Sequence, residues 1–179
     1  LALRDWGKSN RYAGSKDRSA IGNYVYDALR CKNSLEFRMN NDKPRALILG
    51  SAVFIGERTT EELFEAFENN KHSPGQLTKD EILKLSGSID LSGAPDWVRA
   101  DIPEWIWPAF ENNFSDSAID EGNALTKRPP LDLRVNTLKS NVSDVINELK
   151  DKNIKKCAIS PVGLRIAASR ADGRLPNIQ

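Results

Sequence analysis

The stretch PPLDLRVNTLKS, residues 129–140, marks the place where the sequence changes from a helical to a β pattern. Pro129 and Pro130 end the preceding element, because proline has no backbone N–H to donate and disfavours a helical conformation in the residue before it. The next residues alternate between apolar and polar side chains, as in a strand with one buried face. The apolar set is Leu131, Leu133 and Val135, and the polar set is Asp132, Arg134 and Asn136.

The residues after this strand complete a small α/β unit. The segment VSDVINELKDKN, residues 142–153, has an apolar stripe at helical spacing, and Ser140 or Asn141 is suited to cap it. KKCAIS and GLRIAA, residues 155–160 and 163–168, are predicted strands joined by a hairpin-like turn. The order β-α-β-β is the first half of a ferredoxin-like unit. The second half is either missing or supplied by sequence beyond Gln179.

The first 125 residues have a mostly helical pattern. Asp17 is the expected N-cap of DRSAIGNYVYDALRCK, Thr60 that of EELFEAFE, and Thr78 forms a capping box with Glu81. Three prolines suit the first turns of further helices: Pro44, Pro95 and Pro103. The run RALILGSAVFIG, residues 45–56, is apolar nearly all round and is predicted to be a buried helix, although its β-branched residues also permit a strand.

The predicted fold class is therefore α+β. A mostly helical domain is expected at residues 1–125, the small α/β unit at 129–170, and a linker toward a further domain at 171–179. Residues 127–130 form the expected junction.

Charge is distributed unevenly along the chain, although the net charge is only +1. Residues 1–32 carry seven Lys or Arg and three Asp, a net charge of +4. Residues 33–124 have a net charge of −9, and residues 125–179 a net charge of +6. Two basic ends could form positive surface suited to a phosphate backbone, or the pattern could be ordinary surface variation.

Composition argues against several classes of protein. No apolar run reaches the roughly 18 residues that span a bilayer, so no membrane partner is expected. Two distant cysteines, Cys31 and Cys157, form no disulfide framework, which indicates a reducing cytoplasm. His72 is the single histidine, so we expect neither a His-based metal site nor a Ser-His triad.

Basic and amide side chains supply the candidate RNA contacts. On the strands they should emerge from the sheet face that the helix leaves open, where arginines bind phosphates or stack on bases. The alternative is that Arg134 is tied to Asp132 or to backbone carbonyls. Tyr12, in the basic loop RYAGSKDR, could equally pack, and the tryptophan-rich cluster at residues 97–114 is expected to be core. The candidates are Arg11, Lys16, Arg18, Arg134, Asn136, Lys139 and Arg165.

Several segments together resemble the N-terminal part of the RsmB/Sun family of bacterial RNA cytosine methyltransferases. The resemblance rests on RYAGSKDRSAIGNYVYDALR, on APDWVRADIP, and on LTKRPPLDLRVNTLK followed by a helix and ISPVGLRI. It implies a helical region, NusB-like in some members, and then an α/β unit that engages RNA. A catalytic domain would follow, binding S-adenosylmethionine and methylating carbon 5 of a cytosine in ribosomal RNA.

The catalytic part is not recognisable in these residues, so no catalytic, cofactor-binding or metal-binding residue is predicted. LILGSAVFIGE, residues 47–57, has two glycines six apart with bulky residues between, which make no tight turn for a cofactor. The family needs a cysteine thiolate that attacks the base, in a Thr-Cys or Pro-Cys setting, and neither cysteine has one. Whether these residues are themselves enzymatic stays undecided.

Two hypotheses follow. In the first, the chain is the RNA-engaging front part of a methyltransferase, with RNA and its own C-terminal methyltransferase domain as partners. In the second, it is a non-enzymatic docking module whose sheet face packs on another domain. Clustering of the basic residues on one exposed face would favour RNA, and neutralisation of them by carboxylates would favour docking.

Overall fold

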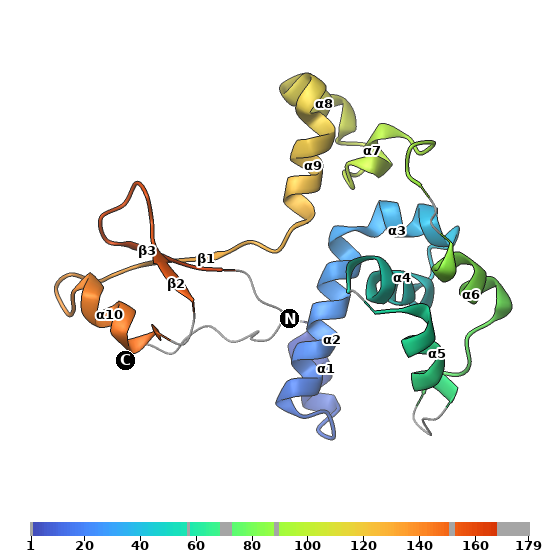
Figure 1. The fold of residues 1–179 in the computed structure, drawn as a ribbon, viewed down its shortest axis with the longest axis horizontal. Helices are drawn as coiled ribbons and strands as arrows, with labels where there is room; N and C mark the ends of the chain where they lie inside the picture. The colour runs from blue at the N-terminus through green and yellow to red at the C-terminus, as the bar shows by residue number, and fades with distance from the viewer. Residues whose placement is uncertain (1, 57, 69–72, 88–89, 151–152, 168–179) are drawn as a thin grey trace. The chain divides into compact units, whose positions relative to one another are not determined.

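The computed structural model describes residues 2–56, 58–68, 73–87, 90–150 and 153–167. Two compact units make up the chain, Leu1–Lys127 and Arg128–Gln179, and each is described here by itself (Figure 1). Four features predicted above fall wholly or partly outside the described residues: His72, Ala168, the end of the helix at 151–152, and the linker at 171–179. No described helix is both long enough and apolar enough to cross a bilayer.

Helices are the regular secondary structure of the described residues of the first unit. Helix α4 lies among α2, α3 and α6 (Figure 1). The elements are α1 (Ala2–Ser9), α2 (Ser15–Arg30), α3 (Lys32–Met39), α4 (Pro44–Gly50), η1 (Ser51–Ile55), α5 (Thr60–Glu68), α6 (Lys79–Ser86), α7 (Asp96–Arg99), α8 (Trp107–Phe114), η2 (Ser115–Ser117) and α9 (Ala118–Thr126).

The apolar run at residues 45–56 is the centre of this core, and its predicted helical state is confirmed. Pro44 begins α4, and residues 46, 47, 49, 50, 51 and 52 are buried. Gly50 permits the close packing of α4 on α3, because a Cβ there would lie 3.1 Å from both Leu35 Cδ2 and Met39 Cγ. Gly50 thus serves helix packing, whereas Gly56 lies against the Ala52 backbone of the preceding turn, and the run has no loop that could admit a cofactor.

Some of the predicted helix starts are wrong by one to four residues. The capping box of Thr78 and Glu81 is confirmed. Asp17 is the third residue of α2 rather than its cap, and its carboxylate accepts the backbone N–H of Gly14. Thr59, not Thr60, makes the reciprocal contacts with Glu62 that begin α5.

Pro103 begins a turn instead of the helix expected there. The N–H groups of Ile106 and Trp107 donate to its carbonyl. The helix itself, α8, starts at Trp107, with Pro108 in its first turn. Proline suits both positions since neither needs its N–H, so the sequence alone did not distinguish them.

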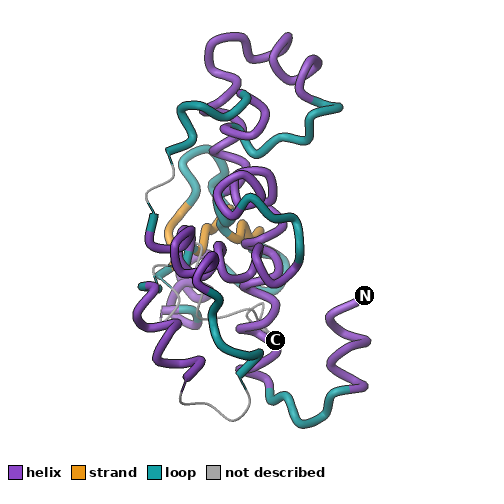
Figure 2. Tube along the Cα trace, turned by 90° about the vertical axis from the view of Figure 1, so that its right-hand side faces the viewer, coloured by secondary structure: helices purple, strands orange, loops and turns teal. Residues whose placement is uncertain are grey.

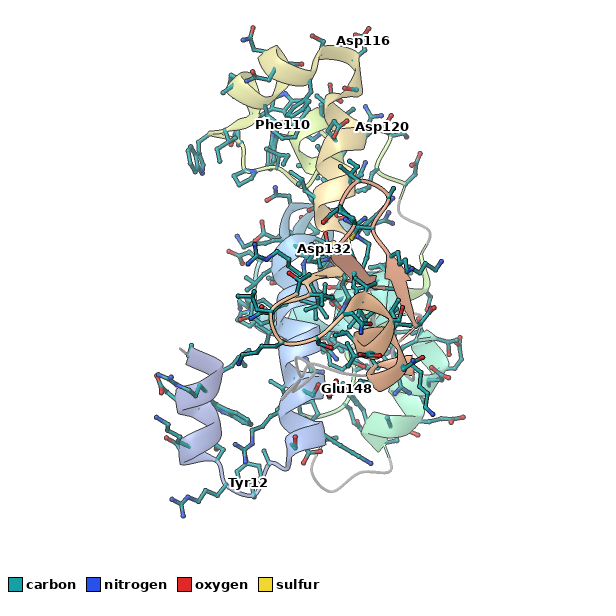
Figure 3. All side chains as sticks on the ribbon, turned by 90° about the vertical axis from the view of Figure 1, so that its left-hand side faces the viewer. Tyr12, Phe110, Asp116, Asp120, Asp132 and Glu148 are labelled. Atoms are coloured by element: carbon teal, nitrogen blue, oxygen red, sulfur yellow. The ribbon has the colours of Figure 1, made fainter. Side chains whose placement is uncertain are left out.

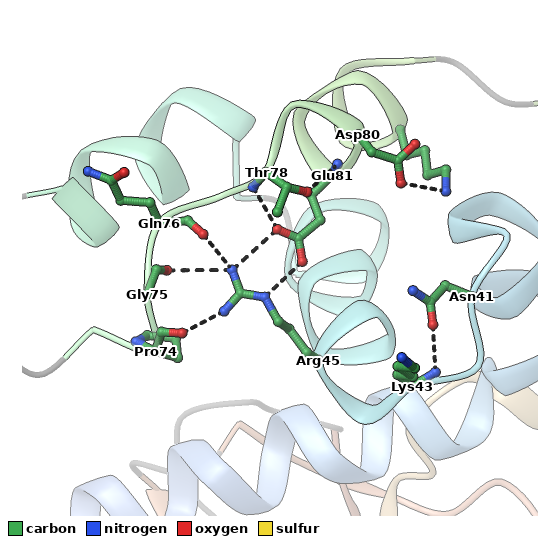
Figure 4. A network of polar contacts seen from close by, with 10 residues as sticks. Asn41, Lys43, Arg45, Pro74, Gly75, Gln76, Thr78, Asp80 and Glu81 are labelled. Carbon is green, nitrogen blue, oxygen red and sulfur yellow. Dashed lines mark hydrogen bonds and ion pairs between the residues drawn. The ribbon is translucent and has the colours of Figure 1, made fainter.

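A side-chain clamp holds the loop before α6 (Figure 4). Arg45 Nε donates to Glu81 Oε1 at 2.7 Å, and its Nη atoms donate to the carbonyls of Pro74 and Gln76 at 2.7 and 3.0 Å. The hydrogen-bonded ion pair between Arg45 and Glu81 lowers the pKa of Glu81 and raises the pKa of Arg45. These contacts use all three guanidinium nitrogens, so Arg45 is a structural residue.

A second cross-link joins α3 to the segment after α7. Asp101, in a left-handed conformation with φ of 52°, accepts the Ser34 N–H at 2.8 Å and the Ser34 hydroxyl at 2.6 Å. Asn33 donates to the carbonyl of Ile102 at 2.9 Å. Asp101 thereby caps α3 from a distant part of the chain, while its burial raises its pKa.

The second unit has the predicted β-α-β-β order. It consists of β1 (Leu131–Arg134), α10 (Val142–Glu148), β2 (Ile154–Lys156) and β3 (Gly163–Ile166). Figure 2 colours the described strands orange, and all of them belong to this unit. The sheet order is β1-β3-β2 with both pairs antiparallel, so β3 lies between two strands that run parallel. This is the split βαβ arrangement, and the α+β fold class is confirmed.

Of the apolar residues predicted to face the helix from the opening strand, Leu133 and Val135 pack in the core with it. Val135, Val145, Leu149 and Leu164 form the buried core of the second unit, and Leu164 is fully buried. Of the two candidate caps, Asn141 is the one used, since its side chain accepts the N–H of Asp144.

The strands are shorter than predicted because turns begin early. The side chain of Asn136 accepts the N–H of Leu138 at 3.1 Å, which bends the chain after β1. β2 stops at Lys156, and the loop that follows is closed at its base by the N–H of Cys157, which donates to the Gly163 carbonyl at 2.9 Å. Gly163 is required at the other end of this loop, because a Cβ there would lie 2.9 Å from Ser160 Cβ.

Candidate nucleic-acid interface

Two of the candidate residues lie at the turn between α1 and α2: Arg11 is within it, and Lys16 is in the first turn of α2, with Tyr12 between them in the sequence. We call residues Arg11, Tyr12 and Lys16 the basic turn. Arg11 and Lys16 are exposed, and among the described residues neither side chain has a hydrogen-bond or ion-pair partner. Tyr12, which the sequence left between packing and binding, is 82% exposed (Figure 3).

Hydrogen bonds and one buried methyl group fix the shape of this turn. The backbone N–H and the side chain of Asn10 both donate to the Trp6 carbonyl, at 2.9 and 2.8 Å. Ala13 is only 3% exposed, and its N–H donates to the carbonyl of Asn10. The Gly14 N–H donates to Asp17 at 2.8 Å. The turn is therefore ordered before it meets any ligand.

Arg18, the remaining candidate in this region, has a different environment. Its Nε donates to the Ala13 carbonyl at 2.8 Å. Its aliphatic carbons lie over Gly7 of α1, since a Cβ at Gly7 would be 3.0 Å from Arg18 Cδ. Arg18 thus ties the turn to both helices, and its Nη1 lies over Gly7 with the aliphatic carbons.

The exposed face of the sheet carries two of the other candidates, Arg134 and Arg165. We call Arg134, Lys155 and Arg165 the basic sheet face. Asp132 lies opposite Arg165 in the β1–β3 register, and Lys155 lies opposite Arg165 in the β2–β3 register. Arg165 binds Asp132 through two nitrogens, at 2.6 and 2.7 Å. The pair lowers the pKa of Asp132 and raises that of Arg165.

The expected alternative for Arg134 is wrong, because Asp132 binds Arg165 instead. Arg134 is exposed, and its side chain has no partner among the described residues. Lys155 was missed as a candidate. The predicted hairpin would have placed Lys155 on the other face from Arg165, and only the longer loop between β2 and β3 brings the two opposite each other.

Asn136 and Lys139 lie in the turn after β1 rather than on the sheet. Asn136 uses its side-chain oxygen to hold this turn, so only its amide NH₂ is open to a ligand. Lys139 is exposed there, next to Leu138, which is 96% exposed.

Neither cysteine is suited to nucleophilic catalysis. Burial, assisted by nearby Asp101, raises the pKa of the Cys31 thiol to about 11, so this thiol is protonated at neutral pH. Cys157 packs against Gly163 in the β2–β3 loop. Within the described ranges there is also no group of three or more side chains able to hold a metal ion.

The tryptophan-rich segment is less buried than predicted. Trp105 is 82% exposed, and no residue of α8 is buried. Trp107, Phe110 and Phe114 contact one another in sequence along the helix, with ring centroids 6.2 and 4.6 Å apart. Acidic residues accompany them, including Asp116 and Asp120 (Figure 3). This surface has the wrong charge for a phosphate backbone.

Residues 102–171 match the family model described as the Methyltr_RsmF/B-like, ferredoxin-like domain. The chain carries this methyltransferase-related domain. The match confirms the resemblance to the RsmB/Sun family that the sequence indicated, while a bacterial origin stays a prediction. No curated protein and no solved structure matches the chain.

The RsmF/B-like domain extends beyond the second compact unit. Its match begins at Ile102, before α8 and α9, whereas the second unit begins at Arg128. The exposed aromatic surface of α8 and the basic sheet face therefore both belong to the matched domain, and the basic turn does not.

Proposed function

We propose that this chain is the RNA-engaging front part of an S-adenosylmethionine-dependent RNA cytosine-5 methyltransferase. The match of residues 102–171 to the methyltransferase-related domain carries this proposal. Cys31 and Cys157 are free thiols, which is compatible with a protein that functions in the reducing cytoplasm. Ribosomal RNA is the proposed substrate, and the parent protein's catalytic domain is the second proposed partner.

The described residues fit no S-adenosylmethionine site. The cofactor needs a glycine-rich loop for close approach of the backbone, and the only candidate run forms the buried α4 and η1. Cofactor binding and methyl transfer are thus assigned to the parent protein's catalytic domain. The role of this chain is to bind and orient the RNA.

Electrostatics supports the RNA assignment at the level of individual side chains. Four candidate cations are exposed without a partner among the described residues: Arg11, Lys16, Arg134 and Lys139. Each one that contacts a phosphate releases counterions, which makes affinity depend on salt with a log–log slope of about −0.7 per contact for single strands.

Filter binding of ribosomal RNA fragments at rising salt tests the proposal. If all four cations contact phosphates, the slope should approach about −2.8. Little sequence preference is expected, because the proposal assigns the pocket for a flipped cytosine to the parent protein's catalytic domain. Salt-independent binding, or no binding at low salt, would contradict the RNA assignment.

The docking hypothesis is favoured by one observation, the exposed aromatic side chains Trp105, just before α8, and Phe114, at its end. Residues 100–126 contain six Asp or Glu and no Lys or Arg, so this surface suits a basic protein face better than RNA. We assign it to the parent's catalytic domain. If Trp105→Ala weakens RNA binding as much as loss of a free cation does, this division of labour is wrong.

A further inference from the structure

Exposed aromatic side chains occur on two surfaces of the first unit, with opposite electrostatic surroundings. Trp105 and Tyr12 are both 82% exposed. Trp105 lies in the acidic segment just described. Tyr12 follows Arg11 directly and precedes Lys16 by four residues. An aromatic ring between two unpaired cations is the arrangement by which single-stranded nucleic acids are held, with bases stacked and phosphates neutralised.

The Tyr12 ring is held in position rather than free to collapse onto the surface. Trp6 of α1 contacts it edge to face, with ring centroids 6.5 Å apart and planes at 80°. An edge-to-face contact covers at most one face of the Tyr12 ring, so at least one face stays available for stacking. The anchored backbone at Asn10, Ala13 and Gly14 fixes the turn from which the ring projects.

Tyr26 provides a contrast within the same unit. It is 54% exposed, on the outer side of α2, but the guanidinium of Arg30 lies over its ring, 6.0 Å from the centroid. That Arg30 also bonds to Asp27 at 3.2 Å. One face of Tyr26 is therefore occupied, and the cation beside it is neutralised. Exposure alone does not distinguish the two tyrosines, but their neighbours do.

We propose that Tyr12 is a base-stacking residue that selects unpaired RNA. In this arrangement an unpaired base stacks on the Tyr12 ring, and Arg11 and Lys16 bind the phosphates on either side of it. Bases in a duplex are already stacked on each other, so a double-stranded RNA gains only the phosphate contacts. This inference rests on the proposed RNA-binding function and adds the class of RNA, single-stranded segments, that the turn recognises.

The test measures fluorescence anisotropy of the full chain with two labelled RNAs at fixed salt. One is a short single-stranded oligoadenylate and the other a blunt duplex of the same length. Tyr12→Ala should weaken oligoadenylate binding about tenfold, within the range seen when a stacking aromatic side chain is removed. Duplex binding should stay unchanged. Tyr12→Phe, which keeps the ring, should match the wild type, and so should the control Tyr26→Ala.

The outcomes separate this inference from the function on which it rests. If the wild type shows no salt-dependent RNA binding, the proposed function fails as well. If the wild type binds but Tyr12→Ala binds oligoadenylate equally well, only the stacking role is wrong. If Tyr12→Ala lost affinity equally for single-stranded and duplex RNA, the stacking role would also be wrong. The tyrosine would then support the shape of the turn and not stack on a base. The stacking role would likewise be wrong if Tyr12→Ala left RNA affinity unchanged but weakened binding to the separately produced catalytic domain. Unchanged thermal unfolding of each variant shows that the fold is intact.

Discussion

At the basic turn the cations are open to solvent, whereas on the basic sheet face one of the arginines is already bound to a carboxylate. Arg11 and Lys16 have no partner among the described residues, while Arg165 makes two short bonds to Asp132. The two surfaces contribute similarly to the charge counted along the sequence. Because a phosphate must displace the carboxylate to reach Arg165, only Arg134 and Lys155 of the sheet face are free. Each surface thus offers two free cations, and the sheet face carries a third that is already paired.

The supports of the two surfaces differ as well. A network of backbone bonds and the buried Ala13 shape the turn, and no described strand is involved. The sheet face depends on a small core centred on the fully buried Leu164. A unit of about 50 residues has a small margin of stability, so the sheet face should be the easier of the two to remove.

Leu164→Ala should have the largest effect, a loss of about 2–5 kcal/mol in the stability of the second unit. All four tryptophans lie before residue 108, so their fluorescence reports on the first unit alone. We expect the methyl NMR signals of Val135 and Val145 to lose dispersion while tryptophan fluorescence stays native. The RNA binding that remains is then that of the basic turn.

A shift of the tryptophan unfolding transition as large as the loss in the second unit would contradict this prediction. It would mean that the two units unfold together, and the comparison between their surfaces could not be made by removing one core.

A smaller effect should distinguish the two arginines of the sheet. Arg134→Gln removes a free cation and should reduce the salt slope by about 0.7, with a weaker affinity at low salt. The double variant Asp132→Asn with Arg165→Gln removes the paired charges together and leaves the net charge unchanged. We expect its RNA affinity to match the wild type in the same filter-binding series. A loss as large as that of Arg134→Gln would show that Arg165 leaves Asp132 to bind RNA.

Much of this architecture follows from local patterns in the sequence. The alternation at residues 131–135 correctly identified which side chains face the helix, and Thr78 with Glu81 correctly marked the start of α6. Helix starts at Asp17, Thr60 and Pro103 were misplaced, because several neighbouring residues were chemically able to cap. Local sequence does not decide among such competitors.

The state of the charged side chains was harder to predict, since it depends on contacts between distant residues. Asp132 and Arg165 are 33 residues apart, and only the strand register brings them together. The exposure of Tyr12 and Trp105 likewise depends on which neighbours the fold supplies. Composition favoured a buried aromatic cluster at α8, but that helix contributes no buried residue.

The central claim is that free cations of the basic turn, and not total charge, bind the RNA. The most direct test is the salt dependence of RNA affinity for Arg11→Ala with Lys16→Ala. Its matched control, Lys32→Ala with Arg99→Ala, removes the same charge from the same unit, but these side chains are paired with Glu36 and Asp96 at 2.8 and 2.7 Å. We predict a slope smaller by about 1.4 for the turn variant and a nearly unchanged slope for the control. Equal changes in the two variants, or no change in the turn variant, would contradict the account.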